Sequence, residues 1–161
     1  MVSKSFKITT KPLDTQAELA VLSIDSAGAV VTFEGRVRNH NEGKAVAALY
    51  YEAYERLAES CAETIIQEAL QKFGVEKIIA CHRVGDLKIG EPAVFVAVAS
   101  AHRKEAFQAC QYVIDEIKHR LPIWKKETYK DGSHEWVNCK TCSNHTEATE
   151  IPEPAGSTIS K

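Results

Sequence analysis

Hydrophobic and polar residues alternate along two early segments of the chain in the manner of half-buried β-strands. The first segment covers residues 28–38, GAVVTFEGRVR, and is rich in β-branched residues, and the second covers residues 46–54. The connection between them, residues 39–44, has the sequence NHNEGK, which is typical of a loop or a mobile turn. We therefore predict two strands joined by a polar connection.

Two longer segments repeat apolar residues every three or four positions, which is the spacing of an amphipathic helix. The first covers residues 55–73 and is followed by Gly74, a natural helix stop. The second covers residues 102–121 and ends before Pro122, because proline disfavours helical geometry in the residue that precedes it. The apolar stripe of the second helix consists of Phe107, Cys110, Ile114, Ile117 and Leu121.

The segments 75–84 and 93–100 are predicted to be strands, and the glycines and proline of residues 85–92 indicate a turn between them. A last short strand is predicted at residues 135–137. The order of elements is then strand, strand, helix, strand, strand, helix, strand. This order predicts an α+β fold in which the helices pack against one sheet.

Composition places the chain among ordinary globular proteins, with 161 residues of which 44% are hydrophobic and 26% charged. We expect one domain over residues 1–142. Residues 143–161 contain only Ile151 and Ile159 as large apolar residues, so this segment cannot offset the entropy of ordering and is predicted to be a disordered tail. The net charge of −2 argues against a dedicated nucleic-acid-binding protein.

Five cysteines are scattered through the chain, an odd number without the density of a disulfide framework, and we expect reduced thiols. The longest apolar run, residues 93–99, is far shorter than the ~20 residues that cross a bilayer. The N-terminus lacks the apolar core of a signal peptide. These features predict a cytoplasmic protein that does not enter a membrane.

Basic residues concentrate near the end of the second predicted helix. No acidic residue lies between Ile117 and Lys126, and this stretch contains Lys118 and Lys125. Cations in the last turn of a helix suit its dipole, worth about 0.3–1 kcal/mol each, so a structural role explains Lys118 as well as a catalytic one does. Lys118 nevertheless falls on the border of the apolar stripe, and Lys125 follows a run of large apolar side chains.

Lysines in such surroundings can do chemistry. A free lysine, with a pKa of about 10.4, is almost entirely protonated at pH 7. Neighbouring cations and partial burial lower that pKa, and a decrease of ~2 units would raise the neutral fraction about a hundredfold. The neutral amine is a nucleophile or a base, whereas the charged cluster binds phosphate or carboxylate. One patch could serve both purposes.

Three further basic residues point to an anionic ligand. Arg36 and Arg38 lie on the same side of the first strand by alternation, where they repel each other unless they are solvated or share an anion. An exposed basic strand end is the alternative explanation. Arg103 stands at the start of the second helix, where a cation opposes the helix dipole. The sequence has no phosphate-binding loop of the G-x-x-x-x-G-K-S/T kind.

Cys139 and Cys142 form a single C-x-x-C motif with His145 nearby. A structural zinc site usually needs four ligands, and the sequence has no second pair. The motif does not open a helix after a strand, as a redox pair would. We therefore expect no metal site and no cofactor.

Five ordered blocks of the chain resemble the large, catalytic subunit of molybdopterin synthase, and the resemblance covers residues 7–137. Its most specific feature is the seven-residue spacing of Lys118 and Lys125 within KHRLPIWKKE. The other blocks are GAVVTF at 28–33, GRVRNHN at 35–41, HRVG at 82–85 and SAHR at 100–103.

The resemblance implies a sulfur transferase of molybdenum cofactor biosynthesis. In that family a small ubiquitin-like subunit carries a thiocarboxylate on its C-terminal glycine. Two sulfurs are delivered to cyclic pyranopterin monophosphate and give the dithiolene of molybdopterin. The resemblance also implies a homodimer of large subunits with one small subunit at each far end, a heterotetramer. The implied fold is an α/β hammerhead with an additional antiparallel β subdomain.

The same resemblance implies roles for individual residues. Lys118 is similar to the essential lysine that meets the terminus of the small subunit, and Lys125 to the second active-site lysine. Lys140 stands where the family often has an arginine, and it lacks the bidentate grip of arginine on phosphate. Part of the site can come from the other half of a dimer. The remaining residues that correspond to substrate-contacting segments are Arg36, Val37, Arg38, His102, Arg103, Lys126 and Glu127, together with Lys125 itself.

Two other functions remain open from the sequence. A nucleic-acid-binding α+β module would use basic side chains with exposed Tyr50, Tyr51 and Tyr54, although the aromatic pattern of an RNA-stacking sheet is absent. A catalytically retired scaffold would only dock the small subunit, and the presence of Lys118 and Lys125 argues against it.

Overall fold

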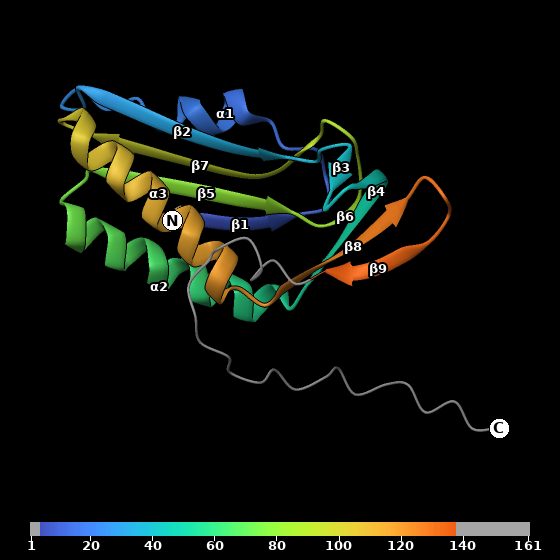
Figure 1. Cartoon of the computed structure of the whole chain (residues 1–161). Coiled ribbons are helices and arrows are strands. Elements are labelled where there is room, and N and C mark those ends of the chain that lie inside the picture. Colours follow the sequence, from blue (N-terminus) through green and yellow to red (C-terminus); the bar gives the residue numbers. More distant parts are fainter. Residues whose placement is uncertain (1–3, 138–161) are drawn as a thin grey trace.

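Two β-sheets form the framework of the computed structural model, which describes residues 4–137 (Figure 1). The first sheet has the strand order β1–β5–β7–β2. Strand β1 runs parallel to β5, and the other neighbours are antiparallel. Strand β2 therefore forms one edge of this sheet. The strands are β1 (Phe6–Thr9), β5 (Lys77–Arg83), β7 (Pro92–Ser100) and β2 (Ala29–Arg36).

Both faces of the first sheet are covered. Helices α2 (Glu55–Phe73) and α3 (Arg103–Arg120) pack together on one face, where they bury the main apolar core (Figure 1). Residues 13–27, which include α1 (Thr15–Ala20), cover the other face with a smaller cluster centred on Leu22. Because both faces are covered, the residues of β5 and β7 are buried almost continuously, and β7 is almost entirely apolar rather than alternating.

The second sheet is antiparallel and lies at one end of the first (Figure 1). Its strand order is β3–β4–β8–β9, and β6 also pairs with β4. The sheet has a core of its own, in which Val37, Leu49 and Leu87 are buried. The predicted α+β class is confirmed, and a separate antiparallel sheet accompanies the main one. The strands are β3 (His40–Asn41), β4 (Lys44–Ala53), β6 (Gly85–Lys88), β8 (Ile123–Tyr129) and β9 (His134–Val137).

The predictions of both long helices are confirmed, as are the strands that the alternating and apolar runs indicated. Helix α2 ends at Gly74, whose φ of 63° is the left-handed conformation that glycine adopts without strain. The prediction of a turn over residues 85–92 is wrong in part, because residues 85–88 form strand β6. The prediction of a loop at residues 39–44 is also wrong in part, because β3 and β4 form a tight hairpin there. The elements β1, α1 and β8 were not predicted.

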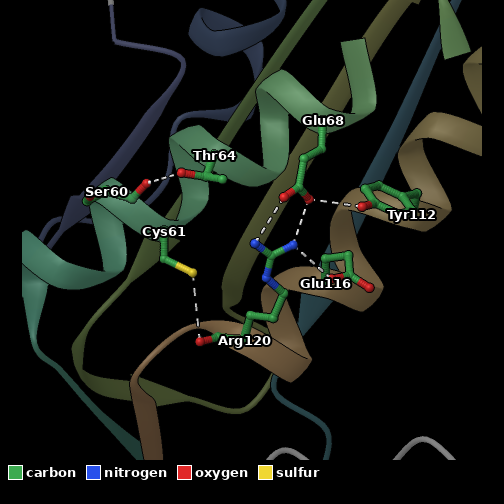
Figure 2. Close-up of polar contacts among 7 residues, drawn as sticks. All are labelled: Ser60, Cys61, Thr64, Glu68, Tyr112, Glu116 and Arg120. Carbon is green, nitrogen blue, oxygen red and sulfur yellow. Dashed lines mark hydrogen bonds and ion pairs between the residues drawn. The ribbon is translucent and has the colours of Figure 1, made fainter. Parts of the chain in front are cut away.

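A cluster of polar contacts fastens the last turns of α3 to α2 (Figure 2). The guanidinium of Arg120 donates hydrogen bonds to both carboxylate oxygens of Glu68, at 2.6 and 3.2 Å. It also forms an ion pair with Glu116 at 3.1 Å. The Tyr112 hydroxyl donates to Glu68 at 3.0 Å. The Cys61 thiol reaches the Arg120 carbonyl oxygen at 3.9 Å. These contacts fix the end of α3 where the chain enters the second sheet.

None of the helices among residues 4–137 is long and apolar enough to cross a membrane.

Candidate active site

A cavity lies where the two sheets meet, and side chains from β2, β3, β4, β7, α3 and β8 line it together with residues just after β2. Its lining contains four basic side chains that come from distant parts of the sequence, namely Arg36, Arg38, Lys118 and Lys125. The carboxylate in the lining is Glu127. Since cations outnumber carboxylates, the cavity suits an anionic ligand.

A second, narrower cavity adjoins the first, and Tyr51, Val94 and Lys118 line both of them. The rest of its wall is mainly apolar and is made by Ile114, Ile117, Leu121, Ile123 and His82. Lys118 therefore stands between a polar, cationic space and an apolar one.

Lys118 projects from the last turn of α3 and is exposed. Within residues 4–137 its ammonium makes no ion pair and no hydrogen bond. Its predicted position at the border of the apolar stripe agrees with this geometry, because Ile117 beside it is buried in the core. The helix dipole favours a cation at this position, but it leaves the donors of Lys118 available to a ligand.

Lys125 is held differently. Its side chain is 15% exposed, and its ammonium lies 3.2 Å from Oε1 of Glu127. Glu127 is only 2% exposed and also accepts hydrogen bonds from Asn41, at 3.0 and 3.1 Å, and from the Tyr129 hydroxyl, at 2.9 Å. Burial by itself raises the pKa of Glu127, but these hydrogen bonds outweigh it and hold the pKa below its ordinary value. Glu127 is therefore a carboxylate that anchors Lys125.

Arg36 and Arg38 both face the cavity, as alternation predicts, with Val37 buried between them. The backbone of Val37 is fixed on both sides, since its N–H donates to the Glu91 carbonyl at 3.0 Å and its carbonyl accepts from Gly90 at 2.7 Å. Val37 thus contributes backbone geometry to the site, while its side chain packs in the core of the second sheet.

His102 and Arg103 do not reach this cavity within one chain. They stand at the N-terminal end of α3, and the fifteen residues from Arg103 to Lys118 span about 22 Å of helix. Lys126 also lies elsewhere. Successive residues of a strand point to opposite faces, and its ammonium lies 5.4 Å from the ring centre of Tyr50 and 5.8 Å from that of Trp136. The expectation that all these residues share one site is therefore not met by a single chain.

Two residues that were not predicted line the cavities. Asn41 bonds Arg38 as well as Glu127; it lies in the block 35–41 that carries the resemblance, but no role was predicted for it. His82 is 7% exposed, and its Nδ1 lies 2.8 Å from the Arg83 carbonyl oxygen. Because a carbonyl can only accept, Nδ1 carries the proton and Nε2 keeps its lone pair. Burial lowers the pKa of His82 to about 4, so the ring is neutral.

No group of three or more His, Cys, Asp or Glu side chains arranged for a metal ion occurs in the described part of the chain. The C-x-x-C motif with its nearby histidine, Lys140 and the predicted tail all lie outside the described residues.

The fold and the site define an α+β protein with a cation-lined cavity that contains one anchored and one unpaired lysine. The chain belongs to the MoaE family, because the model of the family described as MoaE protein matches residues 8–120.

Named relatives agree with this assignment. A molybdopterin synthase catalytic subunit from Thermoplasma volcanium is 42% identical over 84% of this chain and 99% of its own length. One from a Nostoc species is 43% identical over 88% of this chain and 86% of its own. The crystal structure of molybdopterin synthase from Staphylococcus aureus superimposes with a TM-score of 0.79 at 38% identity, covering 84% of this chain and 98% of that one. A chain from the Helicobacter pylori complex of subunits 1 and 2 of molybdopterin-converting factor gives a TM-score of 0.67 at 26% identity, covering 84% and 90%.

Proposed function

We propose that this chain is the catalytic subunit of a molybdopterin synthase. In this proposal it transfers two sulfurs from the thiocarboxylated C-terminus of a small ubiquitin-like subunit to cyclic pyranopterin monophosphate. The observation that carries the proposal is the position of Lys118, unpaired among the described residues and placed between the cationic cavity and the apolar one. The cytoplasm is the expected location, where Cys61, Cys81 and Cys110, all free thiols, would stay reduced.

The cationic cavity suits the phosphorylated substrate. Arginine offers planar, bidentate donors to a phosphate, and both Arg36 and Arg38 are in the lining. Lys125 adds a cation whose position is fixed by the buried carboxylate of Glu127. In each transfer the thiocarboxylate sulfur bonds to a side-chain carbon of the pterin in place of a carbon–oxygen bond, whose oxygen leaves as water or stays on the phosphate. Water then hydrolyses the resulting thioester, so that the sulfur stays on the pterin and the carrier is left as a carboxylate. Fixed cations stabilise the anionic groups that are present throughout these reaction steps.

The apolar cavity suits the end of the sulfur carrier. A chain that ends in two glycines has no side chains to exclude, so it can enter a narrow space walled by Ile117, Leu121 and Ile123. Such an approach would bring the terminal thiocarboxylate to Lys118, while the pterin occupies the other cavity. The Helicobacter pylori neighbour is a complex of two subunits of molybdopterin-converting factor, which supports a small-subunit partner here.

A second copy of the chain would complete the site. Strand β2 is an edge of its sheet, and its ends, Ala29 and Arg36, are about 23 Å apart. Ala29 pairs with Ser100, so the start of β2 lies next to the start of α3. If two β2 edges pair antiparallel about a twofold axis, His102 and Arg103 of one copy lie near Arg36 of the other. A homodimer with two small subunits then gives the heterotetramer.

The nucleic-acid alternative receives no support from the arrangement of the tyrosines. Tyr51 lines the cavities, Tyr50 lies beside Lys126 on the opposite face of the sheet, and Tyr54 packs edge-on against Trp124. Because Tyr51 lies on the other face from Tyr50, the three rings form no common platform for stacked bases.

The proposal is tested by incubating the protein with thiocarboxylated small subunit and cyclic pyranopterin monophosphate. We expect dithiolene product, and none when the small subunit carries an ordinary carboxylate. Absence of product with both proteins folded would rule the proposal out.

The shared site has a separate test, in which Lys118→Ala and Arg103→Ala chains are mixed after each has been shown to be impaired. A mixed dimer contains one intact site if Arg103 acts across the interface, so activity should reappear. If mixing restores nothing, Arg103 does not serve the partner's site.

A further inference from the structure

The amide of Asn41 connects the two sides of the cationic cavity. Its Oδ1 accepts a hydrogen bond from the Arg38 guanidinium at 3.1 Å. Its Nδ2 donates to both oxygens of Glu127, at 3.0 and 3.1 Å, across 86 positions of sequence. Since Glu127 in turn pairs with Lys125 at 3.2 Å, Arg38 and Lys125 are joined through two intermediate side chains.

The chemistry of these groups requires an amide at this position. A guanidinium can only donate and an ionised carboxylate can only accept, so the group between them must offer an acceptor on one side and a donor on the other. Aspartate has no donor and alanine has neither. The orientation of the Asn41 amide is therefore determined by its two neighbours.

The backbone around Asn41 is equally constrained. Asn41 pairs with Lys44 across the hairpin between β3 and β4, and only Glu42 and Gly43 form the turn. Both turn residues have positive φ, 47° and 78°, as in the two-residue turn that matches the twist of a hairpin. This tight turn fixes the backbone of Asn41, and the hydrogen bonds to Arg38 and Glu127 fix its side chain.

We propose that Asn41 is a positioning residue, whose amide holds the Arg38 guanidinium and the Glu127–Lys125 pair at a fixed separation for binding the anionic part of the substrate. This inference rests on the proposed function. Without the bridge, Arg38 would sample several rotamers, and binding would have to order it again at a cost in affinity.

A simpler role for Asn41 would be to satisfy the buried carboxylate of Glu127, and a matched variant separates the two roles. Tyr129 also donates to Glu127, at 2.9 Å, but it has no contact with Arg38. Tyr129→Phe removes one donor from the carboxylate and leaves the bridge to Arg38 in place. Asn41→Ala removes donors from the carboxylate and breaks the bridge as well.

The experiment measures binding of inorganic phosphate and of cyclic pyranopterin monophosphate to the full chain, with KM and kcat for the pterin. For Asn41→Ala we expect about tenfold or greater loss of affinity for both ligands, appearing in KM more than in kcat. For Tyr129→Phe we expect a loss of less than about threefold, because Arg38 keeps its partner. Asn41→Asp, which has nearly the same shape, should lose at least as much affinity as Asn41→Ala, since its carboxylate faces that of Glu127.

Affinity of Asn41→Ala or Asn41→Asp within threefold of the unmodified protein would overturn the inference. So would an equal loss in Tyr129→Phe, because satisfaction of Glu127 would then explain the whole effect. Failure of the proposed function is recognised separately, since the unmodified protein would then form no dithiolene product. The phosphate measurements test Asn41 in either case.

Discussion

Two carboxylates in this protein, Glu68 and Glu127, have similar partners but different roles. Glu68 accepts from the Tyr112 hydroxyl and pairs with the Arg120 guanidinium between α2 and α3 (Figure 2). Glu127 accepts from the Tyr129 hydroxyl and pairs with Lys125, both on its own strand β8, and it accepts from Asn41 on β3. Each cluster joins elements that are far apart in sequence.

The two clusters differ in burial and in the charge that remains. The Glu68 side chain is 40% exposed, and its cation, Arg120, is shared with a second carboxylate, Glu116. Glu127 is 2% exposed, and its cation faces a cavity with Arg36, Arg38 and Lys118. The first cluster has two carboxylates for one cation, so no cation is left over, and it fastens two helices. The presence of an ion pair therefore does not distinguish the candidate active site, because both clusters contain one. The excess of cations around the Lys125–Glu127 pair is what distinguishes it.

The largest expected effect distinguishes the roles of two cations in the last turn of α3, Lys118 and Arg120. Lys118→Ala should reduce turnover about 10³-fold or more, because a catalytic amine is removed, and should change the free energy of unfolding by less than about 0.5 kcal/mol. Arg120→Ala should do the reverse, lowering the free energy of unfolding by about 1 kcal/mol with little effect on kcat. Urea unfolding and the dithiolene assay measure the two quantities. Equal effects of the two variants on either quantity would remove the distinction between the clusters.

The next effect concerns the carboxylates themselves. Glu127→Gln leaves Lys125 without its counter-charge and sets an amide donor against Asn41 or Tyr129, so the free energy of unfolding should fall by about 2–3 kcal/mol. Glu68→Gln should destabilise the protein less, because water can solvate the exposed groups that remain. Denaturant midpoints at equal slopes give the comparison. A larger loss in Glu68→Gln would contradict the importance assigned to burial.

A pH effect is expected from His82, which lies beside Lys118 and Arg83. Its folded pKa of about 4 is below its ordinary 6.5, so between these values the unfolded chain binds more protons than the folded one. Stability from this group is complete above pH 6.5 and decreases as the pH falls toward 4. Between pH 7 and pH 5 the loss is about 2 kcal/mol. In His82→Asn, whose amide can still donate to the Arg83 carbonyl, the difference between the two pH values should shrink by that amount.

The smallest effect tests how the hairpin serves the Glu127 cluster. Gly43 has a φ of 78°, and a Cβ added there would meet no atom within 4 Å, so Gly43→Ala introduces backbone strain without a clash. The free energy of unfolding should decrease by about 1 kcal/mol. Because the turn carries Asn41, phosphate affinity should decrease too. Gly74→Ala, also at positive φ and also free of clashes, is the matched control, since Gly74 follows the last residue of α2 and is outside the cavity lining.

Much of the fold could be predicted because the apolar residues of each main element follow a single pattern, either helical or strand-like. Helix α3 shows a clear apolar stripe, and β7 is an apolar run of strand length. Strand β8 was missed because Lys125 and Glu127, which face inward, are charged. Polar residues on the inner face break the alternation by which a strand is recognised, and this happens where a strand lines a site.

The candidate site was predictable where a residue had a distinctive place on its own element, as Lys118 and Arg38 did. It was not predictable where partners meet through the fold. Asn41 and Glu127 are 86 residues apart, and only the pairing of β3 and β8 with β4 brings them together. Lys126 illustrates the opposite error, because its neighbour Lys125 lines the cavity while its own side chain lies on the other face.

Helix α3 also limits how the length of the chain can vary. It extends from Arg103 at one end to Lys118 at the other without interruption. One residue inserted between them would turn every following side chain by about 100° and take Lys118 out of the wall of the cavity. The turn at residues 130–133, between β8 and β9, carries no such requirement and can lengthen freely. Insertions and deletions are thus expected at the tip of that hairpin and excluded from the helix.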